Sequence, residues 1–565
     1  MNEKQQSDKQ MLLDAQGKGV LANLKVFGKL SGPGWLQSAI TLGGGSLAGA
    51  LFLGVVGGTQ LLWVQLASML MGVVMLSAIS YVTLSTGKSP YKMILKDVNP
   101  VLALGWLFAS LMANMIWVMP QYSLSYSAIT QNLAPNLFEN PDAASSKWTI
   151  TMILYALATG MVMCYGSKGK GQKIFDLTVK LIVGAIVICF MAVCFKLVFI
   201  DKAVDFASVF SGFIPSLTHF NQPIDTFNNS IQQIADPIAQ DFWRTETIDL
   251  QQTVLIAAAA FAVGVNMTFM MPFSMLGRGW DKTFRGLAVF DLSTGMVIPF
   301  VLATGCVVVA SSAAFHGKPI DGALETINGK VVISANAPDK IKKSLEGMIA
   351  KRQKVTDSEI SNQELQLAAM LLKRDTGSFT KALEGIVGPK VANIIFGLGV
   401  LAMGLSTITM LMLICGFCVC ELGGFEHGGK AHKLGTLLGT TGILWPVIWG
   451  QGSGAFLAVV TGTFGYIFLP VAYIAFFVMF NSKKVMGEHR PTGGKRWTWN
   501  ILMAISVIFT SWAAFGGAWN KKLGDFYFGR YFVIGFIILA IGGQIYMYLK
   551  HKKEALNLNA EPAND

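Results

Sequence analysis

The chain has 565 residues, of which 53% are apolar and only 13% are charged, and its formal net charge is +12. Soluble proteins contain about 25% charged residues, so this composition excludes a water-soluble globular protein. The positive balance does not indicate a nucleic-acid partner, because lysines and arginines concentrate in the short segments between apolar stretches, as in membrane proteins.

Apolar stretches long enough to cross a bilayer recur along almost the whole sequence. A spanning helix needs about 20 residues, so about twelve of them with their connectors form one integral domain. We predict an all-α polytopic membrane protein with a polar segment 1–31, a transmembrane domain 32–549 and a tail 550–565. The predicted spans are 32–57, 59–85, 100–130, 148–166, 173–199, 253–277, 284–313, 390–420, 433–450, 454–480, 498–517 and 529–549.

The first predicted span is interrupted at its midpoint by Gly43-Gly44-Gly45-Ser46. Glycine lowers helix stability, and three in a row favour an unwound stretch with unpaired carbonyls and amides. Such backbone must face protein or a water-filled cavity, and in transporters it marks the binding site. The alternative is that these glycines only allow close packing of helices.

The sixth predicted span contains a proline within Met270-Met271-Pro272-Phe273-Ser274. Proline removes one amide and disturbs the preceding turn, so we expect this helix to break or kink there. Two breaks that lie five spans apart are typical of a pair of five-helix inverted repeats, with a site between the broken helices at the membrane midplane.

The connectors predict the orientation of the chain. Lysine and arginine collect around residues 88–96, 168–173, 278–285, 430–433 and 483–496, which alternate with acidic or neutral connectors. Short cytoplasmic loops collect positive charge, so we predict that both termini are cytoplasmic. We also predict that the protein lies in the inner membrane of the cell. The long connector 314–389 is then extracytoplasmic, and we expect helix around 339–373.

Cysteine and histidine give no metal or redox motif within the predicted spans. The seven cysteines lie in or at the ends of apolar segments, and we interpret them as reduced core residues. All six histidines lie outside the predicted spans, so no imidazole is expected in the membrane site.

Four segments match a known pattern, namely Gly32-Pro33, Gly43 to Ser46, Met271 to Ser274 and Gly404 to Thr409. In these segments the chain resembles the natural resistance-associated macrophage protein (NRAMP) family of metal transporters, over about residues 30–515. The resemblance implies a LeuT-like 5+5 inverted repeat with discontinuous helices 1 and 6. Asp291 also looks like an aspartate that this family carries at the inner start of span 7.

The positions that bind metal in the family carry different residues here. Gly43 and Ser46 replace an aspartate and an asparagine, Phe273 replaces a histidine, and Phe468 replaces a glutamine in span 10. Of that set only the thioether of Met271 remains. A bare divalent ion needs carboxylate, imidazole or similarly strong donors. The sequence therefore favours a small polar or anionic organic solute, with a divalent metal ion bound by Met271 and backbone carbonyls as the alternative.

The candidate residues fall into three groups. For substrate binding they are Gly43, Gly44, Gly45, Ser46, Asn114, Gln121, Thr268, Met271, Phe273 and Phe468. Trp117, Tyr122 and Asn266 are expected nearby. The candidates for binding a coupling ion, which would be sodium or alternatively a proton, are Ser406 and Thr407. The candidates for an inner gate are Asp291 and Arg285.

Three function classes remain open at this point. A secondary transporter working by alternating access fits the paired breaks best, and a membrane sensor without transport is the second class. An enzyme is not expected, because the spans contain no catalytic cluster and the chain has no phosphate-binding Gly-x-x-x-x-Gly-Lys-Ser/Thr segment. We expect no cofactor, and as partners the lipid bilayer and a small transported solute or ion.

Overall fold

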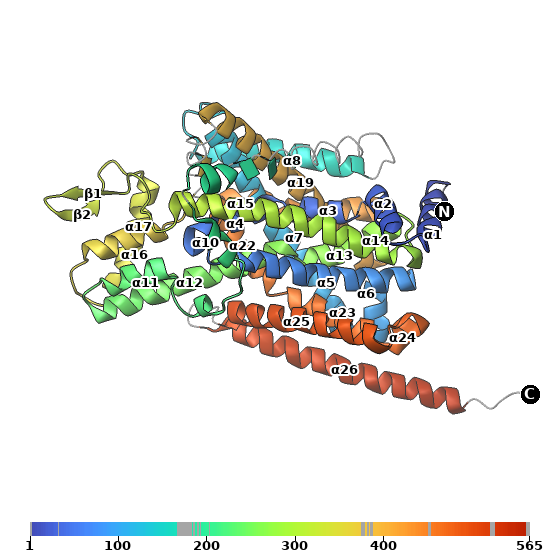
Figure 1. Cartoon of the computed structure of the whole chain (residues 1–565). Helices are drawn as coiled ribbons and strands as arrows, with labels where there is room; N and C mark the ends of the chain where they lie inside the picture. Colours follow the sequence, from blue (N-terminus) through green and yellow to red (C-terminus); the bar gives the residue numbers. More distant parts are fainter. Residues whose placement is uncertain are drawn as a thin grey trace, which may run out of the picture.

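The structure, a computed structural model, describes residues 3–31, 33–165, 184, 187–188, 191–192, 194–202, 204–374, 379–380, 384, 388–449, 454–519 and 526–560. Most of these residues are helical, and the long helices run side by side (Figure 1). Eight helical segments among them are long and apolar enough to cross a membrane. The predicted all-α polytopic fold is confirmed, although most of the predicted span 173–199 lies outside the described residues.

The predicted span 433–450 is not a continuous α-helix, because a 3-10 helix at Leu437–Leu444 separates two short α-helices there. Helices follow the other predicted spans in the described part of the chain, and apolar side chains buried between them form one continuous core. These helices are α3 (Pro33–Thr41), α4 (Gly44–Gly57), α5 (Trp63–Thr86), α7 (Pro100–Ser127), α8 (Ala144–Tyr165), α12 (Pro237–Ala262), α13 (Val265–Gly277), α14 (Arg285–Leu292), α15 (Ile298–Phe315), α19 (Pro389–Gly423), α22 (Gly454–Tyr466), α23 (Leu469–Asn481), α25 (Gly493–Trp519) and α26 (Phe528–Ala560). Shorter helices are α1 (Glu3–Ala15), α2 (Val20–Leu30), α6 (Pro90–Met93), α10 (Phe206–Ser211), α11 (Asp225–Gln232), α20 (Lys430–Thr436), α21 (Trp445–Ile448) and α24 (Lys483–Met486).

Two of the helices that build the site begin with the same local signal. Asn99 and Asp236 precede α7 and α12, and each is followed by a proline at the first helical position. Their side-chain oxygens accept hydrogen bonds from backbone amides of the first turn, at Val101 and Ile238. Such caps satisfy amides that have no partner within the helix, while proline has no amide to satisfy.

Both termini lie at one end of the helical bundle, and a hairpin with two further helices lies at the other end (Figure 1). We call the connector between α15 and α19, residues 316–388, the cap. It contains an antiparallel hairpin of β1 (Leu324–Ile327) and β2 (Lys330–Ile333), followed by α16 (Asp339–Gln353) and α17 (Asn362–Leu371). The two helices fall within the range predicted to be helical. Termini at the same end fit an even number of spans.

The first and sixth spans are both broken, but the sixth is broken at a different place than predicted. Helix α3 ends at Thr41 and α4 begins at Gly44, as the glycine run predicts. Helix α12 ends at Ala262 and α13 begins at Val265, so the second break lies at residues 263–264. A break at residues 270–274 is not present, because Pro272 lies inside α13 and the helix continues through it, so a kink at this proline is the part of the prediction that stays open.

Close approach of α7 explains the position of the second break. A Cβ atom at Gly264 would lie 2.5 Å from a ring carbon of Trp117 on α7 and 2.5 Å from Oδ1 of Asn266. Only glycine leaves room for that ring, and Gly264 lies in extended backbone.

Candidate functional site

A cavity of about 40 Å³ lies where the two breaks meet; we call it the break cavity. Helices α3, α4, α7, α12, α13 and α19 contribute its walls. Its lining residues are Ile40, Thr41, Gly43, Gly45, Ser46, Trp117, Gln121, Ala260, Phe261, Gly264, Asn266, Met267, Thr407 and Leu411. Of the predicted substrate-binding residues, Gly43, Gly45, Ser46 and Gln121 therefore line one cavity, and the predicted ion ligand Thr407 lines it too.

Hydroxyl groups at the first break satisfy carbonyls that the breaks leave without helical partners. The Ser46 hydroxyl donates to the carbonyl of Thr41 at the end of α3 and, at 3.3 Å, to that of Phe261 near the end of α12. The Thr41 hydroxyl lies 3.5 Å from the carbonyl of Ala262. These contacts tie the two broken helices together and stabilise both helix ends, which would otherwise leave polar groups unpaired in the membrane.

Two buried oxygens beside the first break have no hydrogen-bond partner, Oε1 of Gln121 on α7 and Oγ1 of Thr407 on α19. A Cβ atom at Gly44 would lie 2.9 Å from the Gln121 oxygen, and one at Gly43 would lie 2.5 Å from the Thr407 oxygen. Glycine at both positions therefore brings these oxygens next to the break. Gly44 itself contacts Gln121 without lining the cavity.

The thioether at the cavity belongs to Met267 and not to Met271. Met267 Sδ lies 3.5 Å from the hydroxyl of Thr41 and 3.5 Å from the amide of Gly264, and the residue lines the cavity. Met271, one turn further along α13, instead accepts a hydrogen bond from Gln37 at 3.5 Å. Met271 was chosen from its resemblance to the family motif, and its role in binding stays a prediction.

Two further predicted residues lie next to the cavity rather than in its wall. Asn114 accepts a hydrogen bond at 2.9 Å from the lining residue Asn266. Thr268 points toward α7, where its hydroxyl accepts from the indole of Trp106 at 2.9 Å. Asn114 and Thr268 thus position α13 against α7, and neither lines the break cavity.

Three predicted site residues lie away from the break cavity. The Phe273 ring stacks on Phe417 with centroids 5.0 Å apart. Phe468 packs edge-on against Phe464 and against Phe532 of the last helix. The hydroxyl of Ser406 donates to the carbonyl of Met403 in its own helix at 3.0 Å, so only Thr407 of the predicted coupling-ion pair reaches the cavity.

The predicted inner gate consists of two residues with different contacts. Asp291 is fully buried, and its carboxylate accepts hydrogen bonds from the Ser31 hydroxyl and from the amide of Gly34 at 2.5 Å. Arg285 donates to Ser85 at 3.1 Å and lies over the ring of Tyr81 at 4.8 Å. Asp291 therefore holds the first turn of α3, and a gating role for either residue stays a prediction.

The sequence analysis missed seven lining residues, namely Ile40, Thr41, Ala260, Phe261, Gly264, Met267 and Leu411, and Gly264 marks the second break. Gly264 follows the run Ala257 to Ala260, and a glycine after small residues near the middle of a span is the signal that could have found it. Phe261 has no comparable signal, because its role depends on tertiary contact: its ring fills the space that the missing side chains of Gly45, Gly49 and Gly462 leave.

Paired breaks around one cavity define the class of this protein: a polytopic helical membrane protein with a LeuT-like fold. A family model described as "Natural resistance-associated macrophage protein-like" matches residues 365–515. That match confirms the resemblance to the NRAMP family. No curated protein sequence matches the chain significantly.

Solved structures show the same fold at low sequence identity. A mutant of a manganese transporter from Eremococcus coleocola is 14% identical, with a TM-score of 0.61, covering 94% of this chain and 96% of that one. The same transporter with an aromatic bis-isothiourea substituted compound is 13% identical, with a TM-score of 0.60 over 94% and 96% of the two chains. MhsT in complex with L-phenylalanine is 14% identical, with a TM-score of 0.50, covering 86% of this chain and 99% of that one.

Proposed function

We propose that this protein is a secondary transporter that carries a small metal cation by alternating access, with the break cavity as the binding site. The observation that carries the proposal is the pair of buried oxygens without partners, Gln121 Oε1 and Thr407 Oγ1, beside the first break. Leaving a buried acceptor unsatisfied costs about 1–3 kcal/mol. A cation in the cavity would satisfy both oxygens, whereas an anion could accept a hydrogen bond from the Thr407 hydroxyl but would be repelled by the carbonyl oxygen of Gln121.

The size and chemistry of the cavity support an ion over an organic molecule. A volume of about 40 Å³ has room for an ion with one or two waters, and in this conformation it is too small for an organic solute. The lining residues include no carboxylate, imidazole or ammonium group. Neutral oxygens and the thioether of Met267 replace a hydration shell only in part, so we expect the ion to keep some water, as Mg²⁺ commonly does in proteins.

The preference for a small polar or anionic organic solute, drawn from the sequence, is not supported. The NRAMP-like match and the likeness to a manganese transporter support a metal ion instead. The coupling ion stays a prediction, with Thr407 as the hydroxyl in place to bind sodium. A membrane sensor that moves no ion is the remaining alternative.

We expect purified protein in liposomes to take up Mn²⁺, and Thr407→Val and Gln121→Leu to reduce the uptake rate at limiting Mn²⁺. Each substitution removes one oxygen from the cavity with little change in volume. A hydrogen bond to a charged group contributes about 1.5–3 kcal/mol, which corresponds to a loss of about tenfold or more. A fluorescent Mn²⁺ indicator inside the liposomes measures the uptake.

Ser406→Ala is the matched control, because that hydroxyl is bonded within its own helix and lies outside the cavity. It should transport like the wild type. Uptake that is equally sensitive to Ser406→Ala and Thr407→Val would contradict the proposed site. Absence of uptake of Mn²⁺, Mg²⁺ and Na⁺ by the wild type would favour the sensor.

A further inference from the structure

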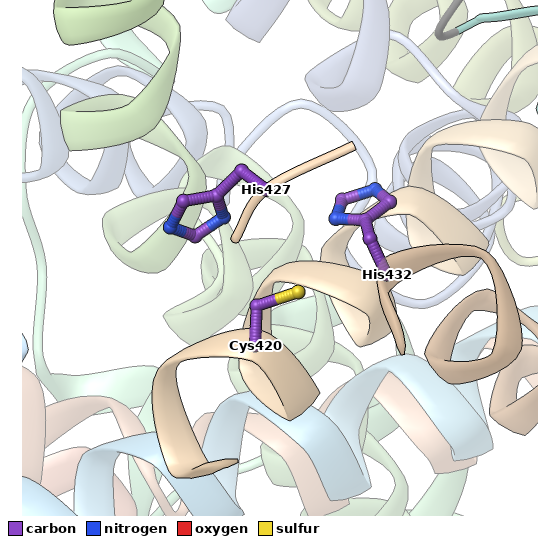
Figure 2. A group of neighbouring side chains, drawn as sticks. All are labelled: Cys420, His427 and His432. Carbon is purple, nitrogen blue, oxygen red and sulfur yellow. The ribbon is translucent and has the colours of Figure 1, made fainter. Parts of the chain in front are cut away.

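A cysteine and two histidines gather at the end of the bundle that carries the termini. They are Cys420 in the last turn of α19, His427 in the connector that follows, and His432 in α20. One ligand atom from each residue lies within 4.8 Å of the others. Figure 2 shows the two imidazole rings facing each other across a gap, with the Cys420 sulfur below that gap.

The backbone between α19 and α20 produces this cluster. Gly424 ends α19 in the left-handed conformation, with φ of 68°, and the amide of Phe425 then returns to the carbonyl of Cys420 at 2.9 Å. Gly428 has φ of 83° and turns the chain again before α20. Residues without a side chain suit both positions, and the double turn brings His427 back over Cys420.

Two observations indicate that the cluster is prepared for a ligand. His432 is only 6% exposed, yet its Nδ1 atom has no hydrogen-bond partner. The other observation concerns His427, whose Nε2 lies 3.0 Å from a carboxylate oxygen of Glu421. That carboxylate is itself held by the Ser89 hydroxyl at 2.7 Å. A histidine that binds a metal through one ring nitrogen usually forms a hydrogen bond to a carboxylate through the other.

We propose that Cys420, His427 and His432 bind a soft divalent cation such as Zn²⁺, at a site separate from the break cavity. One thiolate and two imidazoles are a common ligand set for zinc, and three protein ligands leave a fourth position for water. Ligand atoms around a tetrahedral zinc lie about 3.5 Å apart, so side-chain rotations that move them by about 1 Å close the site. The proposal does not depend on the proposed transport function.

The position of the site gives it a connection to the transport helices. The His427 ring lies 4.8 Å from the ring of Phe273 on α13, and Phe417 on α19 contacts both histidines. A bound cation would therefore fix the connector against the two helices that continue from the break cavity. Phe273, predicted to bind substrate, contributes to the wall of this second site instead.

Cobalt binding to the purified full-length protein in reducing buffer tests the proposal, since Co²⁺ bound to a thiolate gives a charge-transfer absorption band. We expect one equivalent of Co²⁺ to produce the band, and an excess of Zn²⁺ to abolish it. The lining residues of the break cavity include no cysteine, so this band reports only on a thiolate site. Cys420→Ser should lose the band, and His427→Gln should weaken Co²⁺ binding at least tenfold.

Cys418→Ser is the control, because Cys418 is a buried thiol in the same helix but not in the cluster. It should keep the band. The partly exposed side chain of His427 makes its variant a safe second test if Cys420→Ser fails to fold. A wild type without the band, a band that survives Cys420→Ser, or wild-type affinity in His427→Gln would each overturn the proposal.

Discussion

The Arg352→Met variant is expected to lose about 3–5 kcal/mol of cap stability, because it leaves the carboxylate of Glu364 buried without its counter-ion. The side chains of Arg352 and Glu364 are 0% and 1% exposed, and Nε of the arginine lies 2.5 Å from Oε1 of the glutamate. Trp243 on α12 donates to the same oxygen at 3.0 Å. Thermal unfolding and limited proteolysis of the cap in detergent measure the loss.

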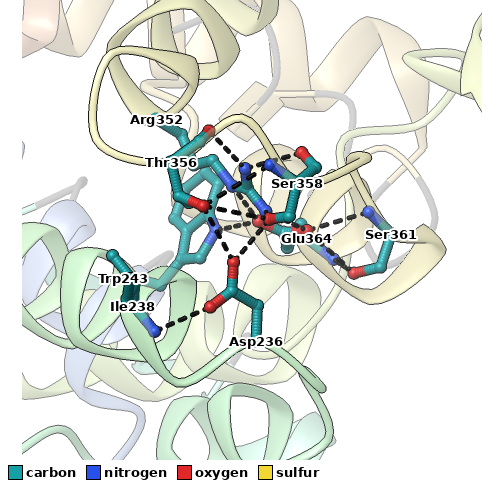
Figure 3. Close-up of polar contacts among 8 residues, drawn as sticks. All are labelled: Asp236, Ile238, Trp243, Arg352, Thr356, Ser358, Ser361 and Glu364. Carbon is teal, nitrogen blue, oxygen red and sulfur yellow. Dashed lines mark hydrogen bonds and ion pairs between the residues drawn. The ribbon is translucent and has the colours of Figure 1, made fainter.

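Figure 3 shows why this pair affects more than the cap. Ser358 and Thr356 of the cap donate hydrogen bonds to Asp236, the residue that caps the start of α12. Helix α12 then runs to the second break. Loss of the Arg352 and Glu364 pair should therefore loosen the outer half of a helix that ends at the break cavity.

A double variant separates loss of the pair from loss of packing. Arg352→Met with Glu364→Gln removes both charges but keeps an acceptor for Trp243 and Ser361, so it should recover much of the stability that Arg352→Met loses. A double variant as unstable as Arg352→Met would show that the buried charge is not the cause.

Acid should weaken the same contact. Burial raises the pKa of Glu364, but hydrogen bonds from Arg352, from the amide and hydroxyl of Ser361 and from Trp243 outweigh burial and hold the pKa below 4.5. A lowered pKa means that the carboxylate stabilises the fold at pH values above 4.5, and that this contribution is lost as the pH falls through the folded-state pKa. If the stability of the cap does not fall as the pH is lowered below 4.5, the ionised Glu364 carboxylate does not stabilise the cap.

The sequence was sufficient for the fold class and for the first break, because both depend on local composition. The glycine run lowers helix stability, and the break lies at its first residue, Gly43, while Gly44, Gly45 and Ser46 already belong to α4. The second break depends on tertiary contact, since Gly264 is required by the ring of Trp117 on another helix. Pro272 carried the stronger local signal, yet a proline inside α13 did not end the helix.

The position of the second break decides which residues of α13 lie at the cavity. Met267 lines it, whereas Met271, which was chosen from a family motif, lies one turn further along the helix. Gln121 and Thr407 also line the cavity, since α7 and α19 pass the break as continuous helices, and their roles in binding stay predictions. The cap contacts had one local signal that was missed, the capping box of Ser361 and Glu364.

The Asp291→Ala variant is expected to release the first turn of α3, with a loss of about 3–6 kcal/mol. Asp291 accepts hydrogen bonds from the Ser31 hydroxyl and the Gly34 amide, and each bond to a charged group contributes about 1.5–3 kcal/mol. The carboxylate also lies at the amino-terminal end of α3, where the helix dipole favours negative charge. Hydrogen exchange followed by mass spectrometry should show faster exchange of the α3 amides.

The contact between α3 and α14 requires a residue without a side chain at position 34. A Cβ atom at Gly34 would lie 2.3 Å from the backbone oxygen of Asp291, so the two helices touch through their backbones. Asp281→Asn is the control, because Asp281 pairs with Lys9 at the surface, where an ion pair contributes about 0–1 kcal/mol. If α3 exchanges no faster in Asp291→Ala than in Asp281→Asn, the carboxylate does not hold α3. If α3 alone is released, Asp291 controls the inner half of the helix that ends at the break cavity, which is what a gate at this face requires.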